Sequence, residues 1–558
     1  KQILDDSLKM LRFTLQSHIE GNYYCLDKQS WGHTWISALG LERMMHGVEA
    51  IEGHLTDEDH KLLEKVIISE CNWLMDCYEV VAGTVVNNKP ESNLWNGAIL
   101  HRAAMMYPNT KRALEYKNKG TKFLINAVSI SQDEMSRKMI DGKMVSDWYV
   151  GDNFFESYSL NHHGYLNVGY MVICLSNVAM LHFSYKKRGL KAPEALYHHS
   201  KELWELIKAM TFTDGRLTRI GGDTRVRYCY CQDYAIPMWI FINDYLNDAD
   251  CEGFENGWLS IVEYEQQYNG DGAFLSVRCD ELKKISPLYY TRLEADRAST
   301  LSMGAYWHRV FEAPTAKGEN IKEIKSWLDE YHGACFEKGN NRIASFVWRG
   351  GEGMVGLCLP KEKSDLAEWR DNLAGQIKGL GCFNTNQVIY HQEQKFAGGF
   401  LTCGAVKVIS KLFAAEQQTD EAVAVEKLVY AALPDDETVV VMQYAHTLMR
   451  SYLSSVKGIL LNIPNDIYNI LERTYYYGDE VKKLTGVSCE KEILKIGSSW
   501  VNVDDCISLI AAYGINEFSI LRPGRRQIGI KRQPSLDPSH KIGMLSADEI
   551  CATCSTDV

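Results

Sequence analysis

Two short stretches of the chain carry side chains whose types and spacing suggest chemistry. In the first, Asp152–Tyr170, the residues Asn161, His162 and His163 precede Gly164 and an apolar run. A helix that starts there would offer unpaired N–H groups and positive potential to an anionic ligand. The alternative is that Asn161 only caps the helix and that the histidines fill ordinary hydrogen-bonding roles.

The second stretch, Asp214–Tyr234, is rich in arginine and tyrosine. Its residues of these two types are Arg216, Arg219, Arg225, Arg227, Tyr228, Tyr230 and Tyr234. Guanidinium groups bind carboxylate or sulfate in bidentate fashion, and nearby positive charge favours a phenolate. In a chain of net charge −12 the cluster predicts a local anion site. The alternative is a surface loop whose arginines pair weakly with acids elsewhere.

Together the two stretches suggest removal of the proton α to a uronate carboxylate, with expulsion of the 4-O-linked sugar. Such a β-elimination needs a group that neutralises the carboxylate, which suits an Asn amide, Arg or His. It also needs a base for the C5 proton, which suits His or a tyrosinate, and an acid for the leaving oxygen, which suits Tyr. The reaction requires no metal or cofactor, and we expect none.

Apolar periodicity indicates which elements position these residues. Up to about Asp280 apolar residues recur at three- and four-residue spacing, which predicts successive helices. The predicted helices are Ser7–Ile19, Thr34–Ile51, Asp57–Val81, Asn93–Met106, Lys111–Val128, Gly164–Phe183, Pro193–Met210 and Gln232–Tyr245. Helices joined without intervening strands pack as hairpins, in a bundle, a solenoid or a closed toroid.

After about Thr300 short alternating segments rich in Val, Ile, Tyr and Trp predict strands. These are Arg342–Trp348, Met354–Leu359, Phe400–Ile409, Lys427–Leu433, Thr438–Tyr444, Ser455–Leu461, Ser498–Asn502, Cys506–Ala512 and Gln527–Ile530. Leu433–Glu437 has the composition of a turn within an antiparallel pair. The order predicts an α+β chain with segregated domains and a boundary between 285 and 305.

With these features the chain resembles the polysaccharide lyases of the heparinase II/III and alginate-lyase type. The resemblance rests on Asn161-His162-His163-Gly164, on the later Arg/Tyr segment and on the β-rich C-terminal half. It implies an incomplete α/α toroid, the catalytic domain, over 1–290 and an antiparallel β-sandwich over 300–558. It also implies a carbon–oxygen lyase acting on an acidic polysaccharide or oligosaccharide, such as a glycosaminoglycan.

The resemblance also implies roles for individual residues. Asn161 would neutralise the carboxylate, and His162 or His163 would serve as base or helper. Tyr228 would be the acid, with Tyr230 and Tyr234 as further candidates. A second-domain His is His391, and His332 competes with it.

Other side chains are candidates for binding the substrate. Arg225, Arg227, Tyr230 and Tyr234 come from the arginine-rich stretch. Aromatic rings that can stack on sugars are Trp31, Trp35, Trp95, Trp148 and Tyr158, and Asn96 adds a polar neighbour. The alternative for each tryptophan is a place in the core.

Composition limits the other classes of function. The net negative charge argues against nucleic acid as a partner. The longest apolar stretch, Tyr165–Phe183, contains Asn167, Ser176 and Asn177, so we expect a buried helix and no membrane partner. Cys551-Ala552-Thr553-Cys554 has no evident second pair, so we expect no zinc site. The sequence leaves the oligomeric state open.

The 16 scattered cysteines and the lack of a visible signal peptide favour a cytoplasmic location. A trimmed leader would instead make the protein secreted or periplasmic. Two rival functions remain. One is a glycoside hydrolase on an α/α toroid that uses two carboxylates from Asp147, Asp152, Glu156 and Asp223. The other is a non-catalytic carbohydrate-binding protein.

Overall fold

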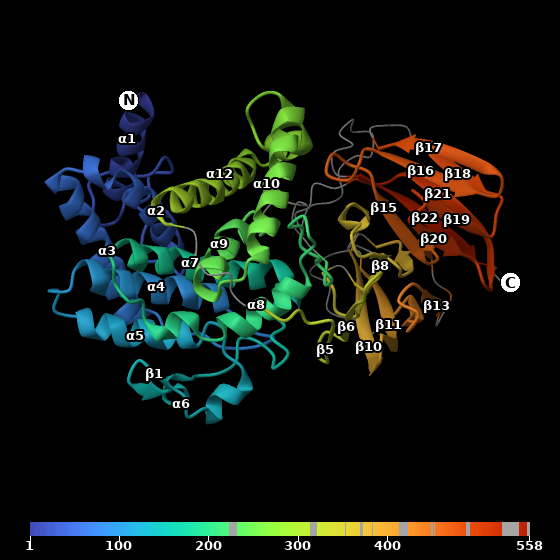
Figure 1. The fold of residues 1–558 in the computed structure, drawn as a ribbon, viewed down its shortest axis with the longest axis horizontal. Coiled ribbons are helices and arrows are strands. Elements are labelled where there is room, and N and C mark those ends of the chain that lie inside the picture. The colour runs from blue at the N-terminus through green and yellow to red at the C-terminus, as the bar shows by residue number, and fades with distance from the viewer. Residues whose placement is uncertain are drawn as a thin grey trace.

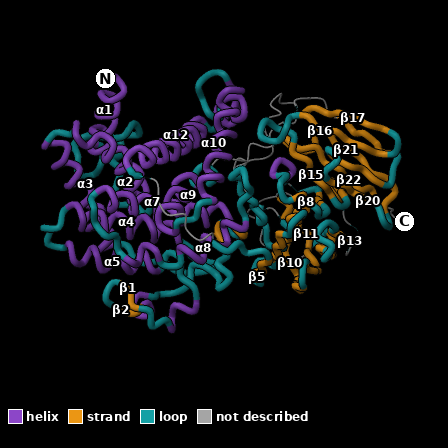
Figure 2. Tube along the Cα trace, viewed as in Figure 1, coloured by secondary structure: helices purple, strands orange, loops and turns teal. Residues whose placement is uncertain are grey.

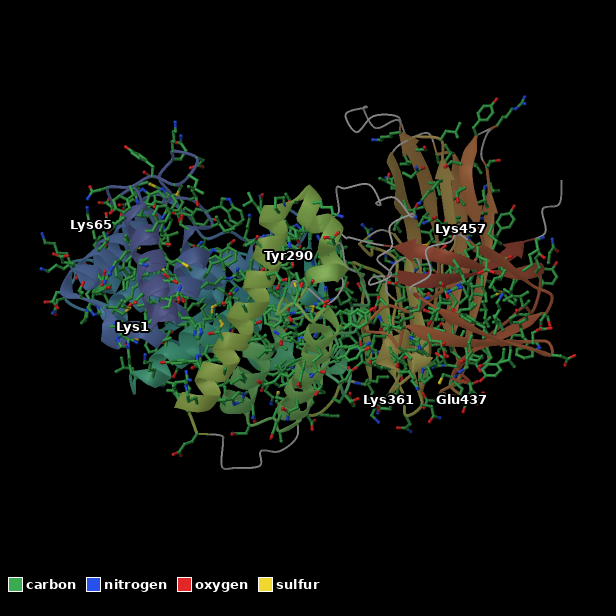
Figure 3. All side chains as sticks on the ribbon, turned by 90° about the horizontal axis from the view of Figure 1, so that it is seen from above. Lys1, Lys65, Tyr290, Lys361, Glu437 and Lys457 are labelled. Carbon is green, nitrogen blue, oxygen red and sulfur yellow. The ribbon has the colours of Figure 1, made fainter. Side chains whose placement is uncertain are left out.

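The chain changes from helices to antiparallel sheets along its length. The computed structural model describes residues 1–222, 231–312, 321–351, 353–368, 372–381, 383–411, 422–447, 450, 452–486, 492–526 and 546–554. Most helices lie in residues 1–312, here called the helical half, and most strands in residues 321–554, the strand half (Figure 1, Figure 2). Figure 3 shows this division from above, with Tyr290 in the helical half and Lys361, Glu437 and Lys457 in the strand half. The predicted order of helices and sheets is confirmed.

The α-helices follow one another with short connections. They are α1 Gln2–Gln16, α2 Ser37–Ile51, α3 Asp57–Cys77, α4 Pro90–Met106, α5 Ala113–Ile125, α6 Val145–Trp148, α7 Val168–Lys187, α8 Ser200–Ala209, α9 Ala235–Leu246, α10 Asp250–Asn269, α11 Asp280–Ile285 and α12 Pro287–Val310. The 3-10 turns are η1 Glu52–His54, η2 Ser131–Met135, η3 Glu194–Tyr197, η4 Ser276–Cys279 and η5 Ser364–Leu366. Thr56 starts α3 with a capping box, in which its hydroxyl accepts from the Asp59 N–H.

Three features of the helical half differ from the prediction. The predicted helix Pro193–Met210 is split into η3 and α8, because His199 between them has a left-handed backbone (φ 54°). Helices α10 and α12 were not predicted. Helix α12 continues to Val310, and the next described strand starts at Ser326. The change from helix to strand therefore comes later in the chain than the boundary predicted at 285–305.

Helix α7 forms the centre of the helical half. Its residues from Val168 to Tyr185 are all buried, and it packs against α4 and α9. By length and composition alone α7 could cross a membrane, but 94% of its most apolar window is buried inside the protein. The prediction of a buried helix is therefore confirmed. Arg102 on α4 ties the helices together, since its guanidinium donates to Glu42 (2.7 Å), Glu49 (3.0 Å) and Ser184 (2.6 Å).

Two short hairpins interrupt the helices, and all other strands of the described residues lie in the strand half. The hairpins are β1 Met139–Ile140 with β2 Lys143–Met144, and β3 Asn161–His162 with β4 Tyr165–Leu166. The strand half contains β5 Ser326–Asp329, β6 Ala334–Lys338, β7 Arg342–Val347, β8 Val355–Pro360, β9 Gln376–Gly379, β10 Phe383–Phe396, β11 Gly399–Lys411, β12 Ala424–Ala432, β13 Val439–His446, β14 Leu453–Lys457, β15 Leu460–Pro464, β16 Glu472–Tyr477, β17 Glu480–Thr485, β18 Glu492–Ile496, β19 Trp500–Val503, β20 Ile507–Ile510, β21 Ile515–Arg526 and β22 Ser546–Cys554.

The strands of the strand half form antiparallel sheets. The four-stranded sheets have the orders β5-β6-β7-β8, β10-β11-β12-β13, β15-β22-β21-β18 and β17-β16-β19-β20, and β14 pairs with β9. The turn predicted at Leu433–Glu437 joins β12 to β13, with Ala432 opposite Val439. The predicted strand Ser455–Leu461 is divided, because β14 pairs with β9 whereas β15 pairs with β22. The predicted strand Gln527–Ile530 lies outside the described residues.

Buried polar contacts join the two halves. Arg216 donates to the side-chain oxygen of Asn469 (2.8 Å) and also to the carbonyl of Tyr468. From the strand half, the ammonium of Lys338 donates to the carbonyls of Ala209 and Thr211, each at 3.3 Å. Because these groups are buried, separating the halves would break these hydrogen bonds and lower stability.

Candidate functional site

The residues Asn161 to Leu166 form a tight hairpin that precedes α7. Asn161 pairs with Leu166, and the turn at His163 and Gly164 has φ values of 59° and 86°. The cap of α7 is Asn167, whose side-chain oxygen accepts from the Tyr170 N–H (3.1 Å). The expectation that Asn161 to His163 directly precede the helix is therefore wrong. Both Asn161 and His162 are buried in the hairpin.

Hydrogen bonds fix the orientation of His162. The amide nitrogen of Asn88 donates to the carbonyls of Gly83 (3.0 Å) and Asn153 (2.7 Å). The amide oxygen of Asn88 therefore faces His162 and accepts from its Nδ1–H at 2.8 Å. With the proton on Nδ1, the basic lone pair of a neutral His162 is on Nε2.

The carboxyl of Glu91, in the first turn of α4, lies beside this Nε2. Its Oε1 is 3.7 Å from His162 Nε2, too long for a direct hydrogen bond. Burial raises the pKa of Glu91 to about 7. Within the described part of the chain, Oε2 of Glu91 has no hydrogen-bond partner. Near neutral pH this site therefore holds a second titratable group beside the imidazole.

A phenol completes the cluster around the hairpin. The hydroxyl of Tyr170, in the first turn of α7, is 3.1 Å from Nε2 of His163. The Tyr170 ring also lies 4.1 Å from the His162 ring, centroid to centroid. His163 is exposed, whereas Tyr170 is buried. The sequence analysis did not single out Tyr170, although its place seven residues after His163 was a possible signal.

The strand half contributes a buried histidine to the same region. His332 donates its Nδ1–H to Asp329 at 2.6 Å, and Asp329 also accepts from the hydroxyls of Ser157 (2.7 Å) and Ser159 (2.6 Å). Burial is the largest single influence and would raise the pKa of Asp329, but the hydrogen bonds and charge of His332 and the two serine hydroxyls together lower it. Nε2 of His332 has no partner among the described residues. Because Ser159 is two residues from Asn161, this dyad lies next to the hairpin.

The other candidate from the strand half, His391, lies close to Gly333, the residue that follows His332. A Cβ on Gly333 would lie 2.8 Å from Nδ1 of His391, so only glycine fits there. His391 is only partly buried, and its Nδ1 is 2.7 Å from Oε1 of Glu393. Both candidates therefore belong to one cluster, and His332 is the more completely buried of the two.

The segment after β7 brings the backbone of Arg349 beside the hairpin. The N–H of Leu166 donates to the carbonyl of Arg349 (3.4 Å), and the N–H of Arg349 donates to the carbonyl of His332 (3.0 Å). The exposed Arg349 guanidinium lies 4.9 Å from the centre of the Tyr331 ring. Arg349 is thus a cation at the junction of the two halves that the sequence analysis missed.

The predicted residues Arg225, Arg227, Tyr228 and Tyr230, and the alternative carboxylate Asp223, lie outside the described residues. The residues on either side of that segment contact the hairpin and α7. A Cβ on Gly221 would lie 2.1 Å from the Leu166 carbonyl, and one on Gly169 would lie 2.8 Å from the Cys231 Cβ. Gly221 therefore lies against the hairpin, and Cys231 lies against the first turn of α7.

Tyr234 and Arg216, from the same stretch, have other surroundings. Tyr234 is 2% exposed, and its hydroxyl donates to Asp296 at 3.0 Å. The Arg43 guanidinium covers its ring at 4.9 Å. Arg216 joins the two halves, as described above. Tyr234 and Arg216 therefore bind other groups of the protein, whereas the sequence predicted that this stretch binds an anion.

The predicted aromatic residues separate into buried and exposed positions. Trp148 is 4% exposed and donates to the Ile140 carbonyl (3.1 Å), which gives it a structural role. Trp31 is partly exposed and donates to the Thr14 carbonyl (2.8 Å). Trp95 and Asn96 are buried, and neither the indole nitrogen nor the amide has a partner among the described residues. Trp35, with 44% of its surface exposed, is the most accessible of this set.

Among the carboxylates of the hydrolase alternative, Asp147 and Asp152 bind within their own loops, and Glu156 binds Ser131, 25 residues earlier. Asp147 accepts from the Met144 N–H (3.2 Å), Asp152 accepts from the Tyr149 hydroxyl and Glu156 from the Ser131 hydroxyl. A hydrolase needs two carboxyl groups that face one bond from opposite sides. The described contacts give these three acids local roles instead.

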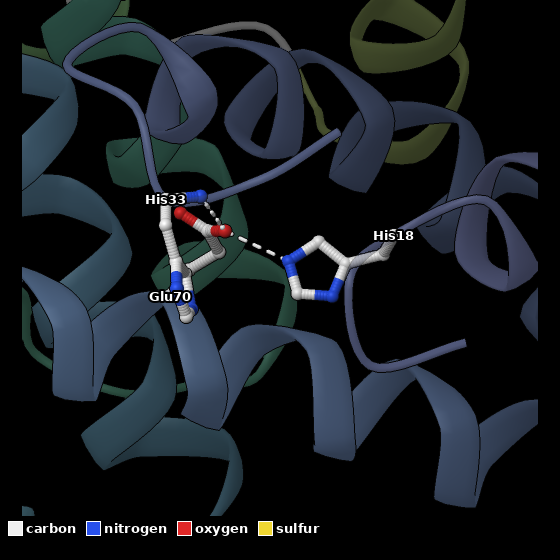
Figure 4. A group of neighbouring side chains, drawn as sticks. All are labelled: His18, His33 and Glu70. Atoms are coloured by element: carbon white, nitrogen blue, oxygen red, sulfur yellow. Dashed lines mark hydrogen bonds and ion pairs between the residues drawn. The ribbon is translucent and has the colours of Figure 1, made fainter. Parts of the chain in front are cut away.

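One compact group of possible metal ligands is His18, His33 and Glu70 (Figure 4). His18 Nδ1 accepts from the Glu20 N–H (3.1 Å), so its Nε2 carries the proton and donates to Glu70 (2.7 Å). The His33 N–H donates to the same oxygen. With Nδ1 accepting and Nε2 protonated, His18 has no lone pair left for a metal. Hydrogen bonding therefore accounts for this group.

A second such group is Asp133, His198 and His199. Nε2 of His198 and Nε2 of His199 lie 3.1 Å and 3.0 Å from the Asp133 carboxylate. Burial by itself would lower the pKa of His199, but the hydrogen bonds with Asp133 and Glu202 outweigh it and raise the pKa to about 9. This group is a charged hydrogen-bond network in which a carboxylate holds a histidine cation.

Comparison with known proteins gives one distant likeness to report. No family model and no curated protein matches the chain. Among solved structures, the chain is similar to the crystal structure of heparinase III, with a TM-score of 0.31 and 10% sequence identity. The match covers 88% of this chain and 78% of the heparinase III chain. A likeness at this level decides neither fold nor activity.

Proposed function

We propose that the protein is a lyase that cleaves an acidic, uronate-containing polysaccharide or oligosaccharide by β-elimination, leaving unsaturated uronate ends. The observation that supports this most is the meeting of an amide, imidazoles and a phenol at one hairpin, which the backbone of Arg349 contacts from the other half. Asn161, His162, His163 and Tyr170 come from the helical half, and Arg349 comes from the strand half. Each step of β-elimination has a suitable group in this set.

In this proposal Asn161 and Arg349 neutralise the uronate carboxylate while negative charge develops on it. Their N–H donors stabilise an enolate more than a neutral acid group. His162 takes the C5 proton through Nε2, since Asn88 holds the proton on Nδ1. The Asp329–His332 dyad has the same arrangement, with a protonated Nδ1 and a basic Nε2, and is the second candidate for base.

The acid that protonates the leaving oxygen is a tyrosine. Tyr228 is the candidate from the sequence resemblance, and Tyr170 is the candidate among the described residues. The proposal also includes the finer architecture, an incomplete α/α toroid followed by a β-sandwich, as two domains. In such an arrangement the joint between the domains would hold the polymer.

New ultraviolet absorbance tests the proposal, because elimination leaves a conjugated, unsaturated uronate. We expect absorbance with at least one polymer from a panel of heparin, hyaluronan, chondroitin, alginate and pectic polymers. New reducing ends without absorbance would identify a hydrolase, and binding without turnover would identify a carbohydrate-binding protein. Either result would refute the lyase.

Substitutions then assign the roles. Tyr228→Phe should abolish cleavage while binding persists, with a rate loss of roughly 10²–10⁴ for a lost general acid. Asn161→Ala should lose a comparable factor, because enolate stabilisation disappears. Tyr264→Phe, at an exposed position on α10, is the matched control. Normal turnover in Tyr228→Phe would move the assignment to Tyr170, tested in the same way.

A further inference from the structure

A lysine and a tryptophan lie together next to the residue that orients His162. Lys89 directly follows Asn88, and its ammonium is 3.9 Å from the centre of the Trp35 ring. Trp35 is 44% exposed, in the connection before α2. A cation held against an exposed aromatic ring, one residue from the catalytic cluster, is placed to meet a substrate that extends beyond the reacting sugar.

Lys89 takes part in none of the ion pairs found among the described residues, although the protein as a whole carries a net charge of −12. Its charge does act on the nearby Glu91 carboxyl, whose pKa it lowers against the larger effect of burial. Lys89 also immediately precedes α4, which starts with Pro90, so the positive end of that helix adds to its potential. The location therefore attracts an acidic group.

Buried polar atoms without partners lie behind Trp35. The Trp35 and Trp95 rings are 6.4 Å apart, and Trp95 is 4% exposed. Its indole N–H has no acceptor among the described residues, and neither amide atom of Asn96 has a partner there. A buried donor without an acceptor is unfavourable, which points to an acceptor oxygen that the described residues do not supply.

We infer that Lys89, Trp35 and Trp95 form a binding subsite for an acidic sugar residue next to the one that is cleaved. Lys89 binds the carboxylate or sulfate of that sugar, the exposed part of Trp35 packs on its ring, and the buried Trp95 ring supports Trp35 from behind. The position next to the cleaved sugar rests on the proposed function. Binding of an acidic sugar by these three side chains does not depend on turnover.

A second lysine–tryptophan pair provides a matched control. The Lys143 ammonium lies 4.5 Å from the centre of the Trp148 ring. Trp148 differs from Trp35 because it is buried and its N–H already donates to Ile140. Lys143→Gln therefore removes the same kind of contact at a place without a free aromatic surface, and we expect it to leave sugar binding unchanged.

The test measures binding by calorimetry, with hexasaccharides from hyaluronan, chondroitin sulfate, heparan sulfate and alginate, each in native and carboxyl-reduced form. For the best-bound hexasaccharide, Lys89→Gln should weaken binding of the native form about tenfold, as expected for one charge-assisted contact. If Lys89 binds a carboxylate, the reduced form should bind both proteins equally. If it binds a sulfate, the reduced sulfated form should still lose affinity in Lys89→Gln.

Further variants separate the ring from the charge. Trp35→Ala should weaken the native and reduced forms alike, and Trp35→Phe should restore part of the loss. Thermal unfolding of each variant shows whether the fold is intact. Wild-type affinity of Lys89→Gln for every hexasaccharide would overturn the subsite, as would the absence of any binding to the wild-type protein. If hexasaccharides bind through Lys89 but no polymer gives ultraviolet absorbance, the lyase proposal fails and the subsite stands.

Discussion

Replacing Glu91 by Gln should change how the stability of the protein depends on pH. Burial raises the pKa of Glu91 from its usual 4.5 to about 7. Between those two values the folded protein keeps a proton that the unfolded chain has released. The free energy of unfolding therefore falls as pH rises through this window, and it stays lower above pH 7.

The size of the effect follows from the change in pKa. At roughly 1.4 kcal/mol per pKa unit, the rise corresponds to about 3 kcal/mol between pH 4.5 and pH 8. Glu91 is 5% exposed, so solvent screening does not reduce this value much. A glutamine has the same shape and never ionises, and Glu91→Gln should therefore lose about 3 kcal/mol less stability than the wild type over this range.

Denaturant unfolding at pH 5 and pH 8 measures the difference. Other groups that titrate in this range are common to both proteins and cancel in the comparison. Glu64→Gln, on the exposed face of α3, is the control and should follow the wild type. Equal losses of stability in Glu91→Gln and the wild type would show that Glu91 is already ionised at pH 5 in the fold, and would refute this reasoning.

Three further predictions concern other contacts of the helical half. Asn88→Ala removes the acceptor for His162 Nδ1–H, so steady-state kinetics should show kcat at least about tenfold lower and KM little changed; an unchanged kcat would exclude His162 as the base. His199 has a folded pKa of about 9, above its unfolded value, so its contribution to stability is complete below about pH 6.5 and is lost as pH rises through 9. Thermal unfolding of His199→Asn should therefore show a smaller loss between pH 7 and pH 9.5 than the wild type, and parallel losses would contradict the charged network. Arg102→Met leaves Glu42 and Glu49 buried without their cation and should lower the free energy of unfolding by about 3–5 kcal/mol in urea titrations; a loss below about 1 kcal/mol would mean that these acids find other partners.

Local patterns in the sequence predicted most of the helices and half of the strands of the strand half. The predicted helix Asp57–Val81 starts where α3 does, and the turn residues of Leu433–Glu437 predicted the β12–β13 hairpin. Among the α-helices and the strands of the strand half, those not predicted are α6, α10, α11, α12, β5, β6, β9, β10, β16, β17, β18, β21 and β22. Helix α12 escaped prediction because charged residues occupy its buried face: Asp296 and Arg297 are buried there beside Leu293. Buried ion pairs interrupt the apolar spacing on which a helix prediction depends.

The candidate site was predictable where its residues are neighbours in the sequence or, for His332 and His391, where the family resemblance pointed to them. Asn161, His162 and His163 were found because they are consecutive. Asn88 and Glu91 lie some 70 residues earlier, and no local pattern links them to His162. Arg349 was missed for the same reason, because its place beside the hairpin depends on how the two halves pack.

The contacts between the halves have a consequence for biosynthesis. A ribosome completes residues 1–312 before Asp329 and Arg349 exist, so the nascent hairpin at 161–166 at first lacks these two partners. Ser159 then has no carboxylate to bind, and Leu166 has no carbonyl from Arg349. A product shortened by a premature stop codon before Asp329 would therefore lack both the Asp329–His332 dyad and Arg349, which the proposed lyase uses.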